Sequence, residues 1–116
     1  MCSIMGYLGN TLTKEDLKPY LDRTASRGPD MQRFATCDGA VLGFSRLSIM
    51  GLCEEGMQPF SYGGNMIVCN GEIYGFRKIK EELISKGYTF KSDSDCEILL
   101  PMYELYGTEM FKMLDA

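Results

Sequence analysis

The sequence of 116 residues contains no histidine. Cysteine nucleophiles are usually activated by a nearby imidazole, so the absence of histidine excludes a cysteine–histidine pair within this chain. The five cysteines include no CxxC pair, and no histidine can complete a zinc site. We therefore expect neither a metal site nor a disulfide framework, and the lack of CxxC argues against a thiol redox module.

The sequence also lacks long apolar runs and clusters of positive charge. No run approaches the roughly 18 residues needed to cross a bilayer, and no basic segment followed by an apolar stretch marks a secretory signal. The net charge of −4 disfavours nucleic acid as a partner. We therefore expect one globular, cytoplasmic domain with no membrane partner, as its 45% hydrophobic and 24% charged residues also suggest.

The N-terminal part of the chain predicts a strand and a helix. Residues 2–8 (CSIMGYL) are apolar at almost every position, which is typical of a strand buried on both faces. Thr13 followed by Asp16 is a helix-start signal, and apolar residues then recur at helical spacing. We expect a helix over residues 14–24.

Two hairpins are predicted next. Asp38-Gly39 separates residues 31–37 from residues 40–48, and Asp-Gly between alternating apolar residues is a strong hairpin signal. Gly63-Gly64 predicts a second turn between a short strand and the apolar run 65–69. The chain should therefore contain antiparallel sheet.

The C-terminal part predicts helices. Residues 75–86 carry apolar residues at helical spacing, and the glycine that follows should end this helix. Ser92 or Ser94 is expected to cap a further helix that ends near Tyr106. Pro101 removes a backbone donor there, so we expect a kink or a shorter helix.

Cys2 is the strongest candidate for chemistry because it directly follows Met1. Removal of Met1 would give it a free α-amine, a group with an ordinary pKa of about 7.7–8.0 that can act as a base. One residue would then supply both nucleophile and base, which is the N-terminal nucleophile arrangement. The other cysteines are expected to be small core residues: Cys37, Cys53, Cys69 and Cys96.

Four segments accompany Cys2: SRGPD at 26–30, SRLSI at 45–49, CNGEIY at 69–74 and SDCE at 94–97. With these motifs in this order, the chain resembles the glutamine-hydrolysing asparagine synthetases, specifically the first part of their class II glutamine amidotransferase domain. Glucosamine-6-phosphate synthase and the purine-pathway amidotransferase share the N-terminal cysteine but differ after the Asn-Gly pair.

The resemblance implies an α+β fold of the N-terminal nucleophile (Ntn) hydrolase type. Such a fold is an αββα sandwich, in which two antiparallel sheets lie between helix layers, and here it would be truncated at its C-terminal side. The resemblance also implies that Cys2 hydrolyses L-glutamine to glutamate and ammonia through a thioester.

Roles at the reacting amide follow from the same resemblance. Asn70 would donate its side-chain amide, and Gly71 its backbone N–H, to the oxyanion that forms when the thiol attacks. Glycine would also allow close backbone approach. Taken alone, Asn70-Gly71 would be read as a turn.

Roles in substrate binding are implied as well. Arg46 would bind the α-carboxylate of glutamine in a bidentate pair, and Glu72 and Asp95 would bind its α-ammonium. Taken alone, Arg46 would be a surface strand residue and Asp95 a helix N-cap. Backbone groups of four consecutive residues would also line the pocket: Leu47, Ser48, Ile49 and Met50. Arg27 and Gly28 would form its wall near the nucleophile.

The chain departs from the family pattern at three positions. Ser45 stands where a histidine commonly precedes the arginine, Gly75 replaces an asparagine after NGEIY, and Pro101 interrupts the last helix. None of these belongs to the implied catalytic set, so they bear on local geometry more than on the reaction.

The expected partners are L-glutamine and a C-terminal synthetase domain outside this chain, which would use the ammonia to amidate aspartate. ATP and magnesium would belong to that domain, because residues 1–116 contain no Gly-rich phosphate loop. The sequence leaves open whether the protein forms a homodimer.

The alternative is a catalytically silent chain that acts only as a folding or interaction unit. With Met1 retained, the nitrogen of Cys2 is an amide and cannot act as a base. Residues 113–116 also read as the approach to a further strand, and an incomplete sandwich would leave strand edges and apolar surface uncovered.

Overall fold

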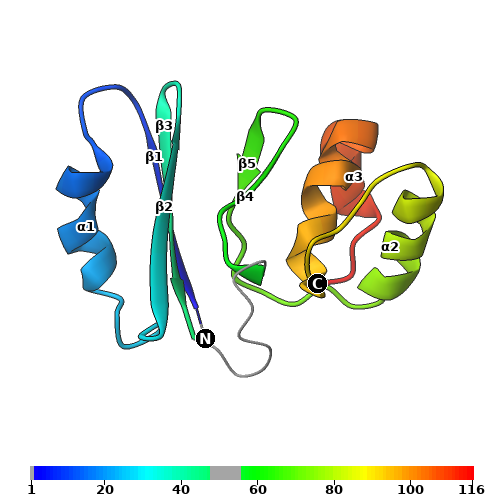
Figure 1. Ribbon diagram of the computed structural model, residues 1–116, viewed down its shortest axis with the longest axis horizontal. Helices are drawn as coiled ribbons and strands as arrows, with labels where there is room; N and C mark the ends of the chain where they lie inside the picture. The colour runs from blue at the N-terminus through cyan, green and yellow to red at the C-terminus, as the bar shows by residue number, and fades with distance from the viewer. Residues whose placement is uncertain (1, 48–55) are drawn as a thin grey trace.

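The computed structural model describes residues 2–47 and 56–116. These residues form an α+β fold with two antiparallel sheets. Helix α1 (Lys14–Asp22) covers one outer side, and helices α2 (Phe76–Ser85) and α3 (Leu99–Tyr106) lie on the other, with both sheets between them (Figure 1). No helix among the described residues is long and apolar enough to cross a membrane.

The first sheet has β3 (Ala40–Arg46) at its centre, between β1 (Ser3–Leu8) and β2 (Met31–Cys37). Strands β2 and β3 form the predicted hairpin, with Cys37 opposite Ala40 across the two-residue turn. Both edge strands run antiparallel to β3. Because β3 is central, its C-terminal end is fixed from both sides.

Strand β1 is confirmed, but it is not buried on both faces as predicted. Its burial alternates: Ser3 is buried, whereas Ile4 is 47% and Leu8 is 85% exposed. The Ser3 hydroxyl lies 2.7 Å from that of Thr24, just after α1, so this face of the strand is the one that α1 covers. The opposite face is only partly covered.

Helix α1 begins where the sequence predicts. Thr13 and Asp16 form a capping box, in which the Asp16 N–H donates to Thr13 Oγ1 (3.3 Å) and the Thr13 N–H donates to Asp16 Oδ2 (2.9 Å). The helix ends at Asp22, two residues before the predicted end.

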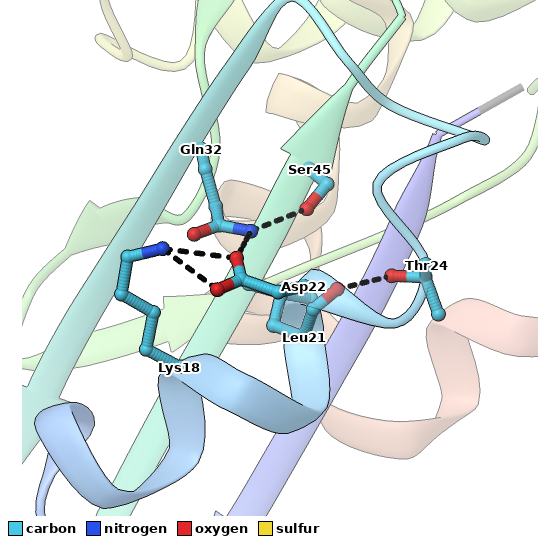
Figure 2. A network of polar contacts seen from close by, with 6 residues as sticks. All are labelled: Lys18, Leu21, Asp22, Thr24, Gln32 and Ser45. Carbon is cyan, nitrogen blue, oxygen red and sulfur yellow. Dashed lines mark hydrogen bonds and ion pairs between the residues drawn. The ribbon is translucent and has the colours of Figure 1, made fainter.

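A polar network ties the end of α1 to the sheet (Figure 2). Lys18 Nζ lies 2.9 Å from both carboxylate oxygens of Asp22, which lowers the pKa of Asp22. Gln32 Nε2 donates to Asp22 Oδ1 (3.1 Å) and to Ser45 Oγ (3.2 Å). The network therefore links α1 through β2 to Ser45, which directly precedes Arg46 at the end of β3.

The second sheet contains β4 (Phe60–Tyr62) and β5 (Asn65–Ile67). Its turn is the predicted Gly63-Gly64, and both glycines have positive φ angles, 57° and 81°. Strand β5 ends at Ile67 rather than at residue 69.

Helix α2 is preceded by Gly75, whose φ of 68° favours glycine, and it ends before Gly87 as predicted. The last predicted helix is divided into a 3₁₀ helix, η2 (Asp95–Ile98), and α3. Pro101 lies in the first turn of α3, where a missing N–H costs no intrahelical bond, so the shorter helix is confirmed.

The predicted serine cap is wrong. Ser94 is the residue before η2 but makes no side-chain capping bond, and Ser92 Oγ accepts instead from the Ser94 N–H at 3.2 Å. A further 3₁₀ helix, η3 (Gly107–Lys112), follows α3, and the Tyr74 N–H donates to the Asp115 carbonyl at 2.7 Å.

Candidate active site

The Cys2 side chain lies at the end of β3. Antiparallel pairing of Ser3 with Ser45 carries Cys2 alongside the residues that end this strand. The Leu47 N–H donates to Cys2 Sγ at 3.4 Å, and the Leu47 carbonyl lies 3.9 Å from the same sulfur. The thiol is half-buried and held at the backbone of the residue that follows Arg46.

The loop after α1 packs against the same strand end. Arg27 Nε donates to the Cys2 carbonyl at 3.4 Å. A Cβ on Gly28 would lie 2.4 Å from the carbonyl carbon and oxygen of Ser45 and 2.8 Å from the Arg46 nitrogen. Only glycine permits this approach of two backbones, so Gly28 sets the position of the loop.

One cleft brings together predicted residues from three separate segments. Arg46 comes from the end of β3, Asn70 and Gly71 from the segment after β5, and Asp95 from the start of η2. The cleft encloses about 480 Å³, which is within the range of small-molecule sites. Its other lining residues are Phe44, Gly56, Gln58, Cys69, Arg77, Ser92, Asp93, Ser94 and Cys96.

Asp95 joins two of these segments. Its Oδ2 accepts the Ile73 N–H at 2.7 Å, and its Oδ1 accepts the N–H of Cys96 at 3.0 Å. Each carboxylate oxygen has a further lone pair. Asp95 can therefore hold the backbone after Gly71 in place and still accept a bond from a cation in the cleft.

Gln58 was not found by sequence reasoning, although it positions the residues before Asn70. Its Oε1 accepts the Cys69 N–H at 2.6 Å, and its Nε2 donates to the Cys69 carbonyl at 3.1 Å. The side chain is 5% exposed and replaces a strand partner beyond the end of β5. The sequence signal was slight: one polar residue among the apolar Met57, Pro59 and Phe60.

Glu97 and Lys80 hold the loop that leads to Asp95, and neither was predicted. The Glu97 carboxylate accepts the N–H groups of Lys91 (3.0 Å) and Ser92 (3.1 Å). Lys80 Nζ donates to the Ser92 carbonyl at 2.9 Å. These bonds fix the loop from both α2 and η2.

Other predicted residues lie elsewhere. Among the described residues, Cys2, Leu47 and Glu72 do not line this cleft, although Cys2 and Leu47 adjoin Arg46. Glu72 is exposed. Three predicted pocket residues lie outside the described residues: Ser48, Ile49 and Met50.

A larger cavity of about 630 Å³ holds none of the predicted site residues. It lies at β2, β4 and α3 and includes Arg33 and Lys91. Within the described parts of the chain, no group of three or more Cys, Asp or Glu side chains is arranged to hold a metal ion.

Residues 1–116 match a family model described as a glutamine amidotransferase domain. The chain belongs to that family. The resemblance based on Cys2 and the four sequence motifs is therefore confirmed.

The amidotransferase domain is also similar to curated proteins. It is 39% identical to asparagine synthetase (glutamine-hydrolyzing) 1 of Bacillus subtilis, over 94% of this chain and 18% of that protein. It is 38% identical to a probable asparagine synthetase (glutamine-hydrolyzing) of Acanthamoeba polyphaga mimivirus, over 100% of this chain and 22% of that protein. Amidase chry2 of Gibberella zeae is 38% identical over 86% of this chain and 15% of its own length. The chain thus spans about a fifth of the length of the relatives that it matches.

The cysteines of the amidotransferase domain differ in burial more than predicted. Cys96 is buried and Cys69 half-buried, but Cys37 is exposed at the end of β2. The core prediction is therefore wrong for Cys37, because the turn that follows it leaves the strand end in solvent. Cys53 lies outside the described residues.

Proposed function

We propose that this amidotransferase domain hydrolyses L-glutamine to glutamate and ammonia, with Cys2 as the nucleophile, and that its fold is an Ntn-type αββα sandwich. The observation that carries the proposal is the placement of the Cys2 thiol against the Leu47 backbone, next to Arg46. Arg46 itself lines the cleft with Asn70 and Asp95. The nucleophile therefore lies beside the residue that follows the cation, and the cation shares its cleft with the anion.

The charges of the cleft suit free glutamine. The guanidinium of Arg46 can pair with the α-carboxylate through two parallel hydrogen bonds. The remaining lone pairs of Asp95 accept hydrogen bonds from the α-ammonium, and the exposed Glu72 is a second anion for this group. The resemblance assigns residues 47–50 to the pocket lining, of which 48–50 lie outside the described residues, and Arg27 and Gly28 would form its wall at the nucleophile.

The reaction divides into two steps. After Met1 is removed, the α-amine of Cys2 takes the thiol proton, and the sulfur attacks the amide carbon of glutamine. Asn70 and Gly71 donate to the resulting oxyanion, each donor lowering the barrier by about 2.7–4 kcal/mol. The proton passes to the leaving nitrogen, ammonia departs, and water hydrolyses the thioester to glutamate and free Cys2.

The rest of the parent protein is part of the proposal. Its relatives named asparagine synthetase suggest a C-terminal synthetase domain that uses ATP and magnesium and passes the ammonia to aspartate. ATP and magnesium would not bind to residues 1–116. A homodimer is compatible with this organisation.

Intact mass and glutamine hydrolysis, measured on the same sample, test the proposal. We expect the purified chain to lack Met1 and an electrophilic glutamine analogue to add to Cys2, as identified by peptide mass. Cys2→Ala should remove both the adduct and glutamate release, whereas Cys37→Ala should retain both, because Cys37 is exposed at the far end of β2. Full glutamate release by Cys2→Ala would rule out the assignment.

The second candidate is the catalytically silent unit, and the exposed face of β1 favours it. Ile4 and Leu8 leave apolar surface on the side of the first sheet that α1 does not cover. A chain that retains Met1, forms no adduct and self-associates would support this candidate instead.

A further inference from the structure

We propose that Cys69 and Cys96 form a reversible dithiol–disulfide site in the wall of the cleft, oxidised by low-molecular-weight disulfides. The proposal does not rest on glutamine hydrolysis, because neither thiol takes part in that reaction. The two cysteines are far apart in sequence and form no CxxC motif, so only the fold brings them together.

Both cysteines lie on the same cleft, and other groups hold their backbones in place. Gln58 holds the peptide of Cys69 through two hydrogen bonds, of 2.6 and 3.1 Å. Asp95 joins the segment after Cys69 to the start of η2 through the Ile73 N–H (2.7 Å). Neither tether involves a sulfur atom, so the backbone segments that carry the two thiols are held independently of them.

The two thiols interact directly. The Cys96 thiol hydrogen-bonds to the sulfur of Cys69, and the Gly71 carbonyl, 4.0 Å from Cys96 Sγ, is a more distant acceptor. The bond from Cys96 lowers the pKa of Cys69 to about 7, against the opposing effects of burial and the Asp95 charge. The same bond, followed by burial, raises the pKa of Cys96.

Exposure assigns different roles to the two sulfur atoms. Cys69 is half-buried and opens onto the cleft, whereas Cys96 is 3% exposed. Redox-sensitive cysteines are typically accessible, carry a lowered pKa and lie next to a resolving thiol. Cys69 is therefore the attacking thiol, and Cys96 resolves the mixed disulfide.

The reaction balances by two thiol–disulfide exchanges. The Cys69 thiolate attacks one sulfur of a disulfide RSSR, forms a mixed disulfide with it and releases RS⁻. Cys96 then gives its proton to the released RS⁻ and attacks the Cys69 sulfur, which releases a second RS⁻ that takes up the proton lost by Cys69. Overall, two protein thiols are oxidised to one disulfide, RSSR is reduced to two thiols, and excess RSH reverses the reaction.

Closing this bond would change the cleft. A disulfide requires a sulfur–sulfur distance of about 2.05 Å, so the two sulfur atoms must move from hydrogen-bonding distance to bonding distance. Asn70 follows Cys69 directly, and Asp95 directly precedes Cys96. Oxidation would therefore form a covalent link directly beside two lining residues of the cleft.

Peptide mapping of the folded chain tests the proposal. The purified chain is incubated with oxidised glutathione, remaining thiols are alkylated, and the digest is analysed by mass. We expect a Cys69–Cys96 linked peptide, lacking two hydrogens, as the main product, and its loss on adding reduced glutathione. In Cys96→Ala the glutathione adduct should accumulate on Cys69, and Cys37→Ala, the matched control, should leave the linked peptide unchanged.

The same oxidation and digestion, carried out on the urea-unfolded chain, distinguishes pairing imposed by the fold from random pairing of cysteines. We expect unfolding to abolish the preference for the Cys69–Cys96 pair. Equal pairing among cysteines in the folded and unfolded chain would overturn the proposal. So would a folded chain that carries glutathione on Cys37 but no Cys69–Cys96 link, and this result does not depend on whether Cys96→Ala folds.

Discussion

At the scale of single residues, two glycines of the site have different surroundings. Gly28 is pressed against the backbone of Ser45 and Arg46, whereas a Cβ on Gly71 would meet nothing within 4 Å. Gly28→Ala should therefore destabilise the fold by about 2–3 kcal/mol or more, because backbone atoms cannot move aside as a side chain can. Gly71→Ala should fold normally and lose glutamine turnover, because its Cβ would stand where the substrate approaches.

Urea unfolding and glutamate release, measured on both variants, check this pair. Glutamine turnover at the wild-type rate in Gly71→Ala would contradict a role for Gly71 at the reacting amide. A stable Gly28→Ala would show that the loop after α1 can leave the end of β3 without cost.

Gln58 allows a sharper test, because it supplies one donor and one acceptor to the same peptide. Gln58→Leu leaves the N–H and carbonyl of Cys69 without partners and should cost about 1–3 kcal/mol of unfolding free energy. Gln58→Glu keeps the acceptor but places a carboxylate oxygen against the Cys69 carbonyl.

Burial and this repulsion should raise the pKa of the introduced carboxyl in the folded state. A raised pKa means that the folded state gains stability as the acid becomes protonated, so the deficit of Gln58→Glu relative to wild type should shrink as pH falls. Urea unfolding of both chains at several pH values measures this difference in unfolding free energy. A deficit that does not change with pH would show that this side chain does not pair with Cys69 in solution.

At the scale of elements, α1 depends on its capping box. Thr13→Ala should lower the unfolding free energy by about 1 kcal/mol. The N–H of Thr13 lowers the pKa of Asp16. A carboxyl whose pKa is lowered in the folded state stabilises the fold when the pH is above its unfolded-state pKa. This stabilisation is lost as the pH falls, so it should decline below about pH 4.

The control is Asp16→Asn, in which this part of the pH dependence should be absent. Helical circular dichroism during urea unfolding at neutral and acid pH measures the difference. An identical acid response in wild type and Asp16→Asn would assign the pH dependence to other carboxylates.

The elements also show which structural features a sequence can predict. Both hairpin turns were predicted because Asp38-Gly39 and Gly63-Gly64 act locally, through positive φ at Gly39 in the first turn and at both glycines in the second. The exposed face of β1 was not predicted, because an apolar pattern does not indicate whether a second layer covers it. The serine cap failed because other acceptors take the N–H groups that the Ser94 side chain would have capped: Asp95 Oδ1 accepts the Cys96 N–H, and the Ser94 carbonyl accepts the Glu97 N–H.

For the site, sequence motifs identified candidate residues, but only the fold shows which of them meet. Arg46, Asn70 and Asp95 line one cleft, as their resemblance-based roles require. Gln58 and the Cys69–Cys96 pair follow no periodicity or spacing rule. Their contacts arise from packing between segments that are distant in sequence, and one sequence alone does not encode them as a pattern.

At the scale of the whole molecule, buried side chains form separate groups on the two sides. Leu17, Leu21 and Val41 are buried where α1 meets the first sheet. A second core involves β4, α2, η2 and α3, with Phe60, Leu83, Ile98 and Met102 among its members. The radius of gyration is 14.5 Å, against about 13.4 Å expected for a compact domain of this length. The molecule is therefore slightly more extended than a compact domain of this length.

An edge strand of the first sheet carries an exposed apolar face. Leu8 is 85% exposed on β1, which has a free edge because, among residues 2–47 and 56–116, it pairs only with β3. Free edges with apolar side chains favour pairing between chains. We therefore expect the 116-residue chain to self-associate with rising concentration, and Leu8→Lys to reduce this association without lowering stability.

Phe111→Lys is the matched control, since Phe111 is also well exposed, at 65%, but lies in η3 rather than on a strand edge. Sedimentation velocity over a range of concentrations compares the three chains. Leu8→Lys should shift the distribution toward monomer, and Phe111→Lys should resemble wild type, because it leaves the β1 edge intact. Equal effects of both substitutions would attribute the association to general surface hydrophobicity, and a wild-type chain that stays monomeric throughout would show that the β1 edge does not mediate pairing.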